Sequence, residues 1–248
     1  MSTSEPITES STLAQPVGTA NIYLSGEYLQ KNPRWHIDES PWKVEQIVRM
    51  LRRHPMKIKS FCEVGCGAGE VLRQLQLQYD EDCTFHGYEI SPQAYEFCKA
   101  RANPRLEFKL MDVRQEPDLV FDLMLVLDVV EHVEDYFSLL RDIKHQARFT
   151  LFHIPLDLSV QTVFRPRGLL KRREMYAHLH YFTKDIALEV LKEVGYEVVD
   201  YFYTPRSVEL GSGLLQWTLR FPRRMCFAVA EDLAVRVLGG YSLLVLAR

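Results

Sequence analysis

Three closely spaced glycines are the residues of this chain best suited to hold a ligand. Gly65, Gly67 and Gly69 stand between a β-prone apolar run at 58–64 and a segment with helical spacing at 71–77. A turn from strand to helix exposes unpaired N–H groups, and glycine there permits positive φ and removes the Cβ atoms that would keep a ligand from the backbone. The pattern predicts a turn on which a flat or anionic ligand lies.

The spacing of these glycines separates two kinds of cofactor. The dinucleotide fingerprint G-x-G-x-x-G needs its third glycine at position 70, where this chain has Glu70. A carboxylate at the start of the helix would repel a pyrophosphate. Glu63, two residues before Gly65, instead suits a ligand that carries an ammonium group. The residues therefore favour a cofactor with an amino-acid tail over a dinucleotide.

Two acids further along the chain extend this site. Residues 84–89 predict a second strand that ends in Glu89, which can accept both hydroxyls of a ribose, as acids at this place also do in NAD-binding domains. Residues 106–110 predict a third strand, and Asp112 after it can accept the exocyclic amine of an adenine. Residues 121–128 predict a fourth strand, whose nearly continuous apolar sequence is typical of a strand covered on both faces.

The chain resembles the class I S-adenosylmethionine-dependent methyltransferases over about residues 40–248, and especially the small-molecule branch that includes the ubiquinone-biosynthesis O-methyltransferases. An ordered series of segments carries the resemblance, because a single glycine loop is weak evidence on its own. The segments are 63–69, Glu89 with Ile90, 111–113, 127–133, 178–183 and 194–199.

The resemblance implies an α/β, Rossmann-like fold. Its seven-stranded, mostly parallel sheet has the order 3-2-1-4-5-7-6, an antiparallel last strand and helices on both faces. Segments 147–153, 196–203 and 241–247 supply the last three strands. Ser40 and Thr183 are predicted to cap helices. Ligands in such a sheet bind beyond the carboxyl ends of the strands, here near the switch between strands 1 and 4.

The resemblance also implies S-adenosylmethionine as the cofactor. Glu63 is expected to meet the methionine amine, Glu89 the ribose, and Asp112 with Val113 the adenine. The full set of predicted cofactor-binding residues is Glu63, Gly65, Cys66, Gly67, Gly69, Glu89, Ile90, Asp112, Val113 and Asp128. Cys66 is interpreted as a small residue that packs near the cofactor rather than as a reactive thiol.

Histidines are the candidate catalytic residues. Methyl transfer from a sulfonium depends mainly on alignment of the reacting groups, and a hydroxyl acceptor also benefits from a base of near-neutral pKa. His132 follows the fourth strand, while His178 and His180 precede the helix after the fifth, so these three are predicted to converge above the methyl group. His153 is a further candidate. We expect O-methylation of a small organic acceptor.

A metal-assisted reaction stays open as a second hypothesis. Asp128, Glu131 and His132, with a later His-x-His, resemble the pattern by which small-RNA 2′-O-methyltransferases hold a divalent ion that orients the hydroxyls of a diol or an RNA ribose. Asp128 is shorter than the glutamate of that pattern, so no metal ligand is assigned. A NAD(P)-dependent oxidoreductase, which Glu70 and Asp112 oppose, and a cofactor-binding module without catalysis also stay open.

Length and composition predict one enzyme domain. The 248 residues are 47% hydrophobic, enough for one large α/β core. Residues 1–20 are rich in Ser, Thr and Pro and predict a disordered tail, with neither a signal peptide nor a membrane span. Residues 21–248 then form a single methyltransferase domain with insertions at 155–177 and 205–240. The aromatic segment 23–36 is interpreted as a lid over the site or as a strap over the core.

Charge and cysteine content limit the partners and the compartment. A net charge of -3 argues against a dedicated nucleic-acid binder and favours a small-molecule acceptor. The five cysteines contain no C-x-x-C pair, so we expect no zinc site and no disulfide framework, and a cytoplasmic protein. The insertion at 155–177 is basic, which indicates a solvated face or attraction of an anionic substrate or a phospholipid. The insertion at 205–240 mixes apolar and basic residues, which predicts contact with a membrane surface, a lid, or packing on a second subunit in a homodimer.

Overall fold

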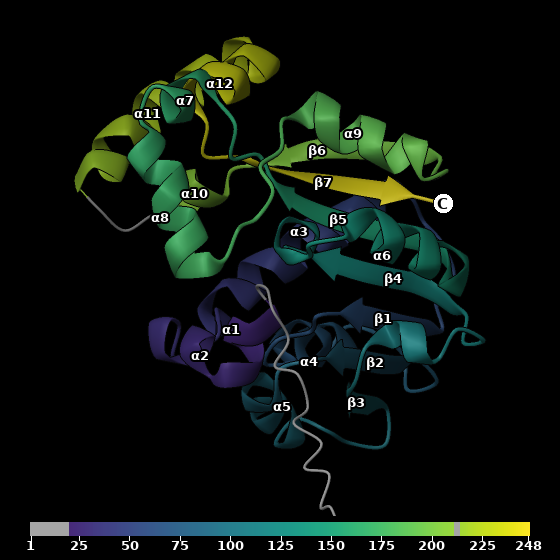
Figure 1. Cartoon of the computed structure of the whole chain (residues 1–248). Helices are drawn as coiled ribbons and strands as arrows, with labels where there is room; N and C mark the ends of the chain where they lie inside the picture. The colour runs from purple at the N-terminus through teal and green to yellow at the C-terminus, as the bar shows by residue number, and fades with distance from the viewer. Residues whose placement is uncertain (1–19, 211–213) are drawn as a thin grey trace, which may run out of the picture.

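The computed structural model describes residues 20–210 and 214–248, and a seven-stranded sheet forms its centre (Figure 1). The strands are β1 (Ser60–Val64), β2 (Thr84–Glu89), β3 (Leu106–Leu110), β4 (Phe121–Leu127), β5 (Ala147–Pro155), β6 (Val198–Thr204) and β7 (Ser242–Ala247). Their order is β3-β2-β1-β4-β5-β7-β6, and β7 runs antiparallel to both of its neighbours. The predicted fold is confirmed. The tail predicted for residues 1–20 lies outside the described residues, apart from Ala20.

Helices pack on both faces of the sheet. The helices are α1 (Ala20–Ser25), α2 (Glu27–Lys31), α3 (Ser40–Arg53), α4 (Glu70–Gln76), α5 (Pro92–Lys99), α6 (Tyr136–Ile143), α7 (Val160–Val163), α8 (Pro166–Tyr176), α9 (Lys184–Glu193), α10 (Arg206–Glu209), α11 (Leu214–Val229) and α12 (Glu231–Leu238). On one face, α3 and α4 bury apolar side chains such as Ile47 and Leu72. On the other face, α6 and α9 bury side chains such as Leu140 and Leu191. The two layers hold the strand ends in fixed positions.

Local sequence explains most element boundaries. Strands β2 and β3 begin and end at the predicted residues. The Thr183 hydroxyl accepts a hydrogen bond from the backbone N–H of Ile186 and caps α9, as predicted. The prediction for Ser40 is wrong. A 3-10 turn at Ile37–Glu39 continues directly into α3, so Ser40 already has helical dihedral angles and Glu39 occupies the position before the helix.

The glycine-rich turn lies where the sequence predicts it. Strand β1 ends at Val64 and α4 begins at Glu70, so the three glycines connect them. Because β1 pairs in parallel with both β2 and β4, the carboxyl ends of these three strands meet at one edge of the sheet. The residues that follow β1, β2 and β4 therefore surround a common space.

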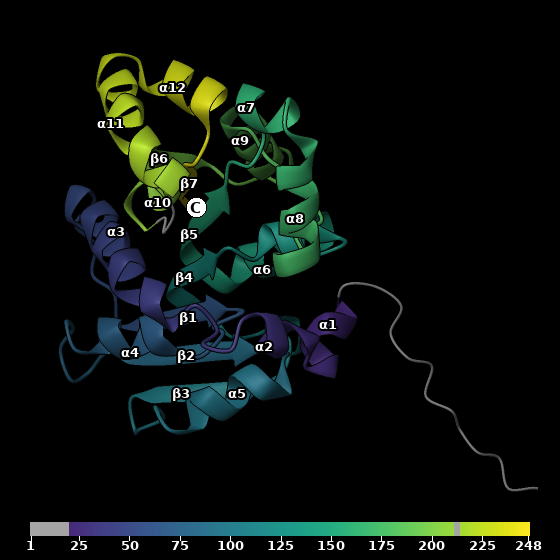
Figure 2. The ribbon, with the colours of Figure 1, turned by 90° about the vertical axis from the view of Figure 1, so that its left-hand side faces the viewer.

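The two predicted insertions and the N-terminal helices gather at this edge. Residues 155–177 form α7 and α8, and residues 205–240 include α10, α11 and α12. Helix α2 lies against α8 (Figure 2), where Lys31 Nζ donates to the backbone oxygen of Glu174 at 2.8 Å. Among the described residues no helix is both long and apolar enough to cross a membrane.

Candidate functional site

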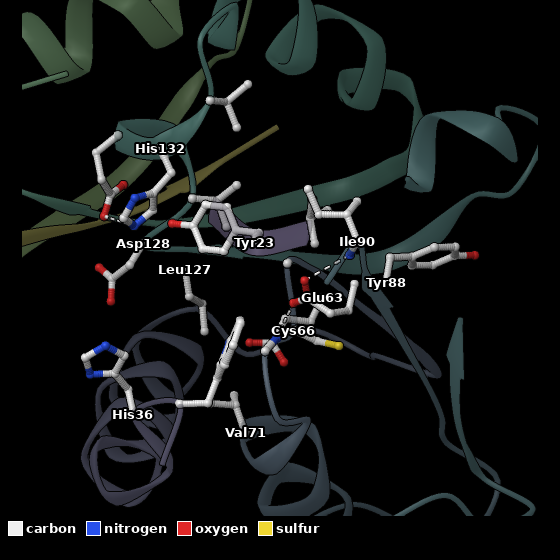
Figure 3. Close-up of a pocket in the computed structure, with 18 of the residues that line it drawn as sticks. Tyr23, His36, Glu63, Cys66, Val71, Tyr88, Ile90, Leu127, Asp128 and His132 are labelled. Carbon is white, nitrogen blue, oxygen red and sulfur yellow. Dashed lines mark hydrogen bonds and ion pairs between the residues drawn. The ribbon is translucent and has the colours of Figure 1, made fainter. Parts of the chain in front are cut away.

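A cavity of about 440 Å³ opens at the carboxyl ends of β1, β2 and β4 (Figure 3). One end is lined by Glu63, the glycine turn and Ile90. The other end is lined by residues that follow β4 and by residues from the N-terminal helices and α8, including His132 and Tyr176. The cavity is large enough for a cofactor and part of a small acceptor.

The glycine turn has the backbone that the sequence predicts. Gly67 and Gly69 have φ values of 56° and 73°, which residues other than glycine rarely adopt. A Cβ at Gly67 would lie 2.8 Å from the Trp35 ring, and one at Gly69 would lie 2.5 Å from the Phe108 ring. Gly65 also has a positive φ, of 64°. The turn accepts glycine at these positions and little else.

Glu63 is a buried acid with an unsatisfied oxygen. Its side chain is only 3% exposed, and Oε2 has no hydrogen-bond partner among the described residues. Burial raises the pKa of Glu63 to about 8, although Lys43 opposes that rise. A buried carboxylate without a partner is costly, so an ammonium group of a ligand would stabilise it.

Glu89 ties the glycine turn to the end of β2. Its carboxylate accepts hydrogen bonds from the backbone N–H groups of Gly67, Ile90 and Ser91 at 2.8–2.9 Å. Burial nevertheless raises the pKa of Glu89 to about 7. Oε1 already accepts two of these bonds, whereas Oε2 accepts only the one from Gly67 and keeps a lone pair for a ligand hydroxyl.

Asp112 and Val113 line the same end of the cavity. The Asp112 carboxylate also caps the turn that follows β3, because Oδ1 accepts the Arg114 backbone N–H at 2.9 Å, and it pairs with the Arg114 guanidinium. Burial raises the pKa of Asp112, but Arg114 outweighs this and lowers it overall. Asp112 therefore stays ionised beside the predicted adenine position.

The ionisation of Cys66 and Glu70 depends on their burial and on residues that are distant in the sequence. Burial raises the pKa of the Cys66 thiol well above its usual value, so this residue packs as a neutral thiol. The sequence predicts that Glu70 repels an anion, yet Arg73 and Arg101 pair with its carboxylate at 2.6 and 2.8 Å. These two arginines neutralise Glu70, so its charge is a weaker argument against a dinucleotide than the sequence indicates.

Asp128 lines the cavity, but both of its oxygens are occupied. Oδ1 accepts a hydrogen bond from His153 Nδ1 at 2.6 Å, and Oδ2 pairs with Lys43 Nζ at 2.7 Å. The far nitrogen of His153 lies 2.9 Å from the Thr204 hydroxyl, and His153 does not line the cavity. Asp128 has a φ of 55°. It therefore fixes the end of β4 beside the cavity.

His132 and His178 face each other beside a second unsatisfied acid, Glu131. Each histidine donates from Nδ1, His132 to the backbone oxygen of Ala177 at 3.2 Å and His178 to Asp157 at 2.7 Å. Their Nε2 atoms are thereby left as acceptors. Both oxygens of Glu131 are buried without a hydrogen-bond partner among the described residues.

The electrostatics of this cluster follow from its burial. Burial raises the pKa of Glu131 well above its usual value, and the nearby charge of Asp128 adds to the rise. Burial, together with His178, lowers the pKa of His132 to about 3, so this imidazole is neutral. The neutral His132 imidazole therefore lies beside Glu131, whose protonated form burial favours, with 3.7 Å between His132 Nε2 and Glu131 Oε1.

The structure does not bring His180 into this group. His180 Nε2 donates to the backbone oxygen of Val133 at 3.0 Å, and the residue does not line the cavity. Of the three histidines predicted to converge, only His132 and His178 do so. In a His-x-His segment neighbouring side chains need not share a direction, and here only His178 turns inward.

Aromatic rings line the end of the cavity that contains His132 and His178. Tyr23 lies edge-on to His132, and its ring is 4.8 Å from that of Tyr28 (Figure 3). His36 and Tyr176 continue the series and return to His178, with ring separations of 5.8 and 6.0 Å. The segment predicted as a lid or a strap thus lines the site.

Three residues of the site carry no sequence signal that could have revealed them. Asp157 meets His178 across 21 positions of chain, Tyr176 enters from α8, and Arg206 enters from α10 to pair with Glu39 at 2.7 Å. Each depends on how the insertions fold back over the sheet, which no local pattern records.

Part of the chain is similar in sequence to known methyltransferases. Residues 62–148 match a family model described as a methyltransferase domain. Ajmaline N-methyltransferase of Rauvolfia serpentina is 28% identical over 115 residues, which are 42% of this chain and 39% of that protein. The chain therefore spans about two fifths of the length of this curated relative.

Solved structures share the fold. The N-methyltransferase NodS of Bradyrhizobium japonicum, in complex with S-adenosyl-L-homocysteine, has a TM-score of 0.59 at 16% identity, over 93% of this chain and 98% of that one. Magnesium protoporphyrin IX methyltransferase of Synechocystis, also with bound S-adenosylhomocysteine, has a TM-score of 0.56 at 16% identity, over 83% and 81%.

Proposed function

We propose that this chain, with its methyltransferase domain at 62–148, is an S-adenosylmethionine-dependent methyltransferase that acts on a hydroxyl group of a small organic acceptor. The family match and the methyltransferase fold support the enzyme class and its cofactor. They also favour this activity over that of a NAD(P)-dependent oxidoreductase. One observation carries the proposal: a single cavity runs from Glu63 to the pair His132 and His178.

The residues at the first end of the cavity fit the cofactor. Glu63 has an unsatisfied oxygen for the amine, Glu89 Oε2 keeps a lone pair for a ribose hydroxyl, and the backbone of the glycine turn lines the cavity. When bound, S-adenosylmethionine supplies an electrophilic methyl group on a sulfonium. The turn residues hold and orient it, which is the main requirement of methyl transfer.

His178 is the proposed general base. The Asp157 carboxylate accepts a hydrogen bond from His178 Nδ1–H, which fixes the tautomer and leaves Nε2 as the basic nitrogen toward the cavity. Nε2 then takes the proton of the acceptor hydroxyl as the oxygen is methylated. Neutral His132 packs edge-on against His178 and Tyr23, with ring separations of 4.9 and 6.0 Å, and shapes this end of the cavity. Tyr23 and the other aromatic rings keep water from the reacting groups.

Turnover with a panel of acceptors tests this proposal. The purified protein is incubated with S-adenosylmethionine and with phenols, catechols, sugars or amines, and S-adenosylhomocysteine is measured by chromatography. Product with a hydroxyl acceptor supports the proposal. Product with amines alone would overturn O-methylation, and binding without any product would indicate a module that has lost catalysis.

Two histidine variants then separate catalysis from packing. His178→Gln is expected to lower kcat at least tenfold while cofactor affinity is retained, since a positioned base contributes about 10²–10⁴ in rate. His180→Gln is the matched control, because His180 lies two residues away and does not line the cavity. Equal effects of the two changes would refute the role of His178.

A second candidate is a methyltransferase assisted by a divalent metal ion. The ligand atoms of Glu131, His132 and His178 all lie within 4.8 Å of one another. Hydrogen bonds from Nδ1 to Asp157 and to the Ala177 carbonyl orient both imidazoles, as outer partners do in metal sites. The unpaired Glu131 carboxylate would gain its missing counter-charge.

In this second candidate Glu131, His132 and His178 hold the ion, and Asp128 takes no part because Lys43 and His153 occupy it. A bound divalent ion would orient acceptor hydroxyls and favour their deprotonation. Calorimetric titration with Mg²⁺, Mn²⁺ and Zn²⁺ tests it. The metal is supported if Glu131→Gln abolishes ion binding and a chelator abolishes turnover. Full turnover in the presence of a chelator would instead support His178 as the general base.

A further inference from the structure

Five apolar side chains form an exposed row on α11 and α12. Phe221, Met225 and Val229 follow one another at intervals of four residues on α11, Leu233 and Val237 do so on α12 after the break at Ala230, and all five are exposed. Phe221 is 73% exposed and Val229 is 84% exposed. Apolar residues at helical spacing normally face a core, so a row that faces solvent indicates a surface that contacts something else.

Helix α7 extends this row. Val160, Val163 and Phe164 are exposed, Phe164 by 83%. Arg223 links α11 to the other two helices. Its guanidinium donates hydrogen bonds to the Gln161 side chain of α7 and to the Leu238 carbonyl at the end of α12, both at 3.1 Å. Figures 1 and 2 both show α7, α11 and α12 together at the end of the molecule away from β3. These eight apolar residues are called the apolar surface below.

Basic residues accompany the apolar surface. The two insertions, 155–177 and 205–240, hold ten Lys and Arg against five Asp and Glu, although the whole chain carries a net charge of -3. Four of the cations, Arg165, Arg167, Lys171 and Arg224, are exposed and have no ion-pair partner within the part of the chain that the structure describes. These four cations belong to the same two insertions as the exposed apolar residues.

We propose that the apolar surface and its four cations dock on an anionic lipid bilayer. Apolar side chains that enter the boundary of headgroups and acyl chains, with cations that meet anionic headgroups, are the two contributions that hold a peripheral helix on a membrane. A second copy of the chain fits less well, because a symmetric interface would press two copies of the same net-positive surface together.

The position of α8 gives this docking a consequence for the cavity. Helix α8 begins next to Phe164 and Arg165 of the docking region and ends at Tyr176, which lines the acceptor end of the cavity. Helix α8 therefore connects the proposed docking region to the cavity. Docking itself does not depend on the proposed methyltransferase activity.

Sedimentation with vesicles tests the proposal. The full chain is mixed with vesicles of phosphatidylcholine alone or with an equal part of phosphatidylglycerol, and the bound fraction is measured. We expect binding to the anionic vesicles only, and a decrease as salt rises, because screening weakens contacts between exposed charges. Absence of binding to anionic vesicles at low salt would overturn the proposal, as would equal binding to both vesicles.

Two double variants locate the contact. Phe221→Ser with Val229→Ser, and Arg165→Glu with Lys171→Glu, are each expected to reduce partitioning at least tenfold. The matched control is Leu77→Ser, since Leu77 is also 73% exposed but lies at the end of α4, far from α11. Binding that survives both double variants would refute this surface.

Two further measurements keep the outcomes distinct. Calorimetry with S-adenosylmethionine on each variant checks that it is folded, so a loss of vesicle binding with intact cofactor binding assigns the effect to the surface. Sedimentation velocity without lipid tests the competing occupant. A dimer that Phe221→Ser with Val229→Ser dissociates would replace the bilayer by a second copy of the chain.

Discussion

Replacement of Glu63 by glutamine tests the cofactor site where the structure is most specific. Glu63→Gln keeps the size of the side chain and removes its charge. A hydrogen bond to a charged group contributes about 1.5–3 kcal/mol, so we expect the Kd for S-adenosylmethionine to rise roughly tenfold to a hundredfold. Titration calorimetry at pH 7 measures this change, and Glu81→Gln, an exposed carboxyl, is the control.

The same substitution has a second effect of opposite sign on the ligand-free protein. With a pKa of about 8, folded Glu63 keeps a proton that the unfolded chain, with a pKa of 4.5, releases. The stability that this proton contributes is complete below pH 4.5 and is lost as pH rises through 8, about 5 kcal/mol as an upper limit. Glu63→Gln should therefore gain stability relative to the wild type between pH 5 and pH 8, as measured by urea unfolding.

Proton release joins the two effects. At pH 7 the ligand-free carboxyl is mostly protonated, so binding of an ammonium group should expel close to one proton from Glu63. Calorimetry in buffers of different ionisation enthalpy measures that release, which should be smaller in Glu63→Gln. Unchanged affinity together with unchanged proton release would refute the assignment of Glu63 to the cofactor amine.

Three further predictions concern single residues. Gly67→Ala should weaken cofactor binding at least tenfold, because its Cβ would lie 2.8 Å from Trp35 at a φ of 56°, whereas Gly168→Ala, whose Cβ would meet only Arg172 at 3.8 Å, should not; calorimetry on both variants decides. Asp157→Asn should lower kcat at least tenfold with little change in cofactor Kd, since the partner of His178 Nδ1 is altered; steady-state kinetics would contradict this if only KM changed. Thr183→Ala should cost about 1 kcal/mol of unfolding free energy through loss of the α9 cap, and thermal melts should show no shift for Ser40→Ala if Ser40 caps nothing.

The sequence predicts the sheet and the cofactor turn well for a physical reason. Strand β4 is almost continuously apolar because both of its faces are covered, and positive φ requires Gly67 and Gly69. Both features can therefore be recognised from a short stretch of sequence. Helix α9 likewise begins at a capping threonine. Each of these features depends on neighbours within a few positions of the chain.

The acceptor end is harder to predict because it is assembled from distant segments. Asp157 becomes a partner of His178 only when the loop after β5 folds back, and His180, in the same short segment, turns away toward Val133. The environment of Glu70 is equally hard to predict, because Arg101, one of the two arginines that neutralise it, lies 31 residues further along the chain. Residue type and spacing identify candidates, and tertiary contacts decide among them.

The most direct test of the central claim is titration calorimetry of the purified protein with S-adenosylmethionine, S-adenosylhomocysteine and NAD, with and without magnesium. We predict micromolar binding of the first two ligands and none of NAD, because Glu63 supplies an unpaired buried carboxylate for an amine. Binding of NAD alone would contradict the assignment of the cavity and of the activity.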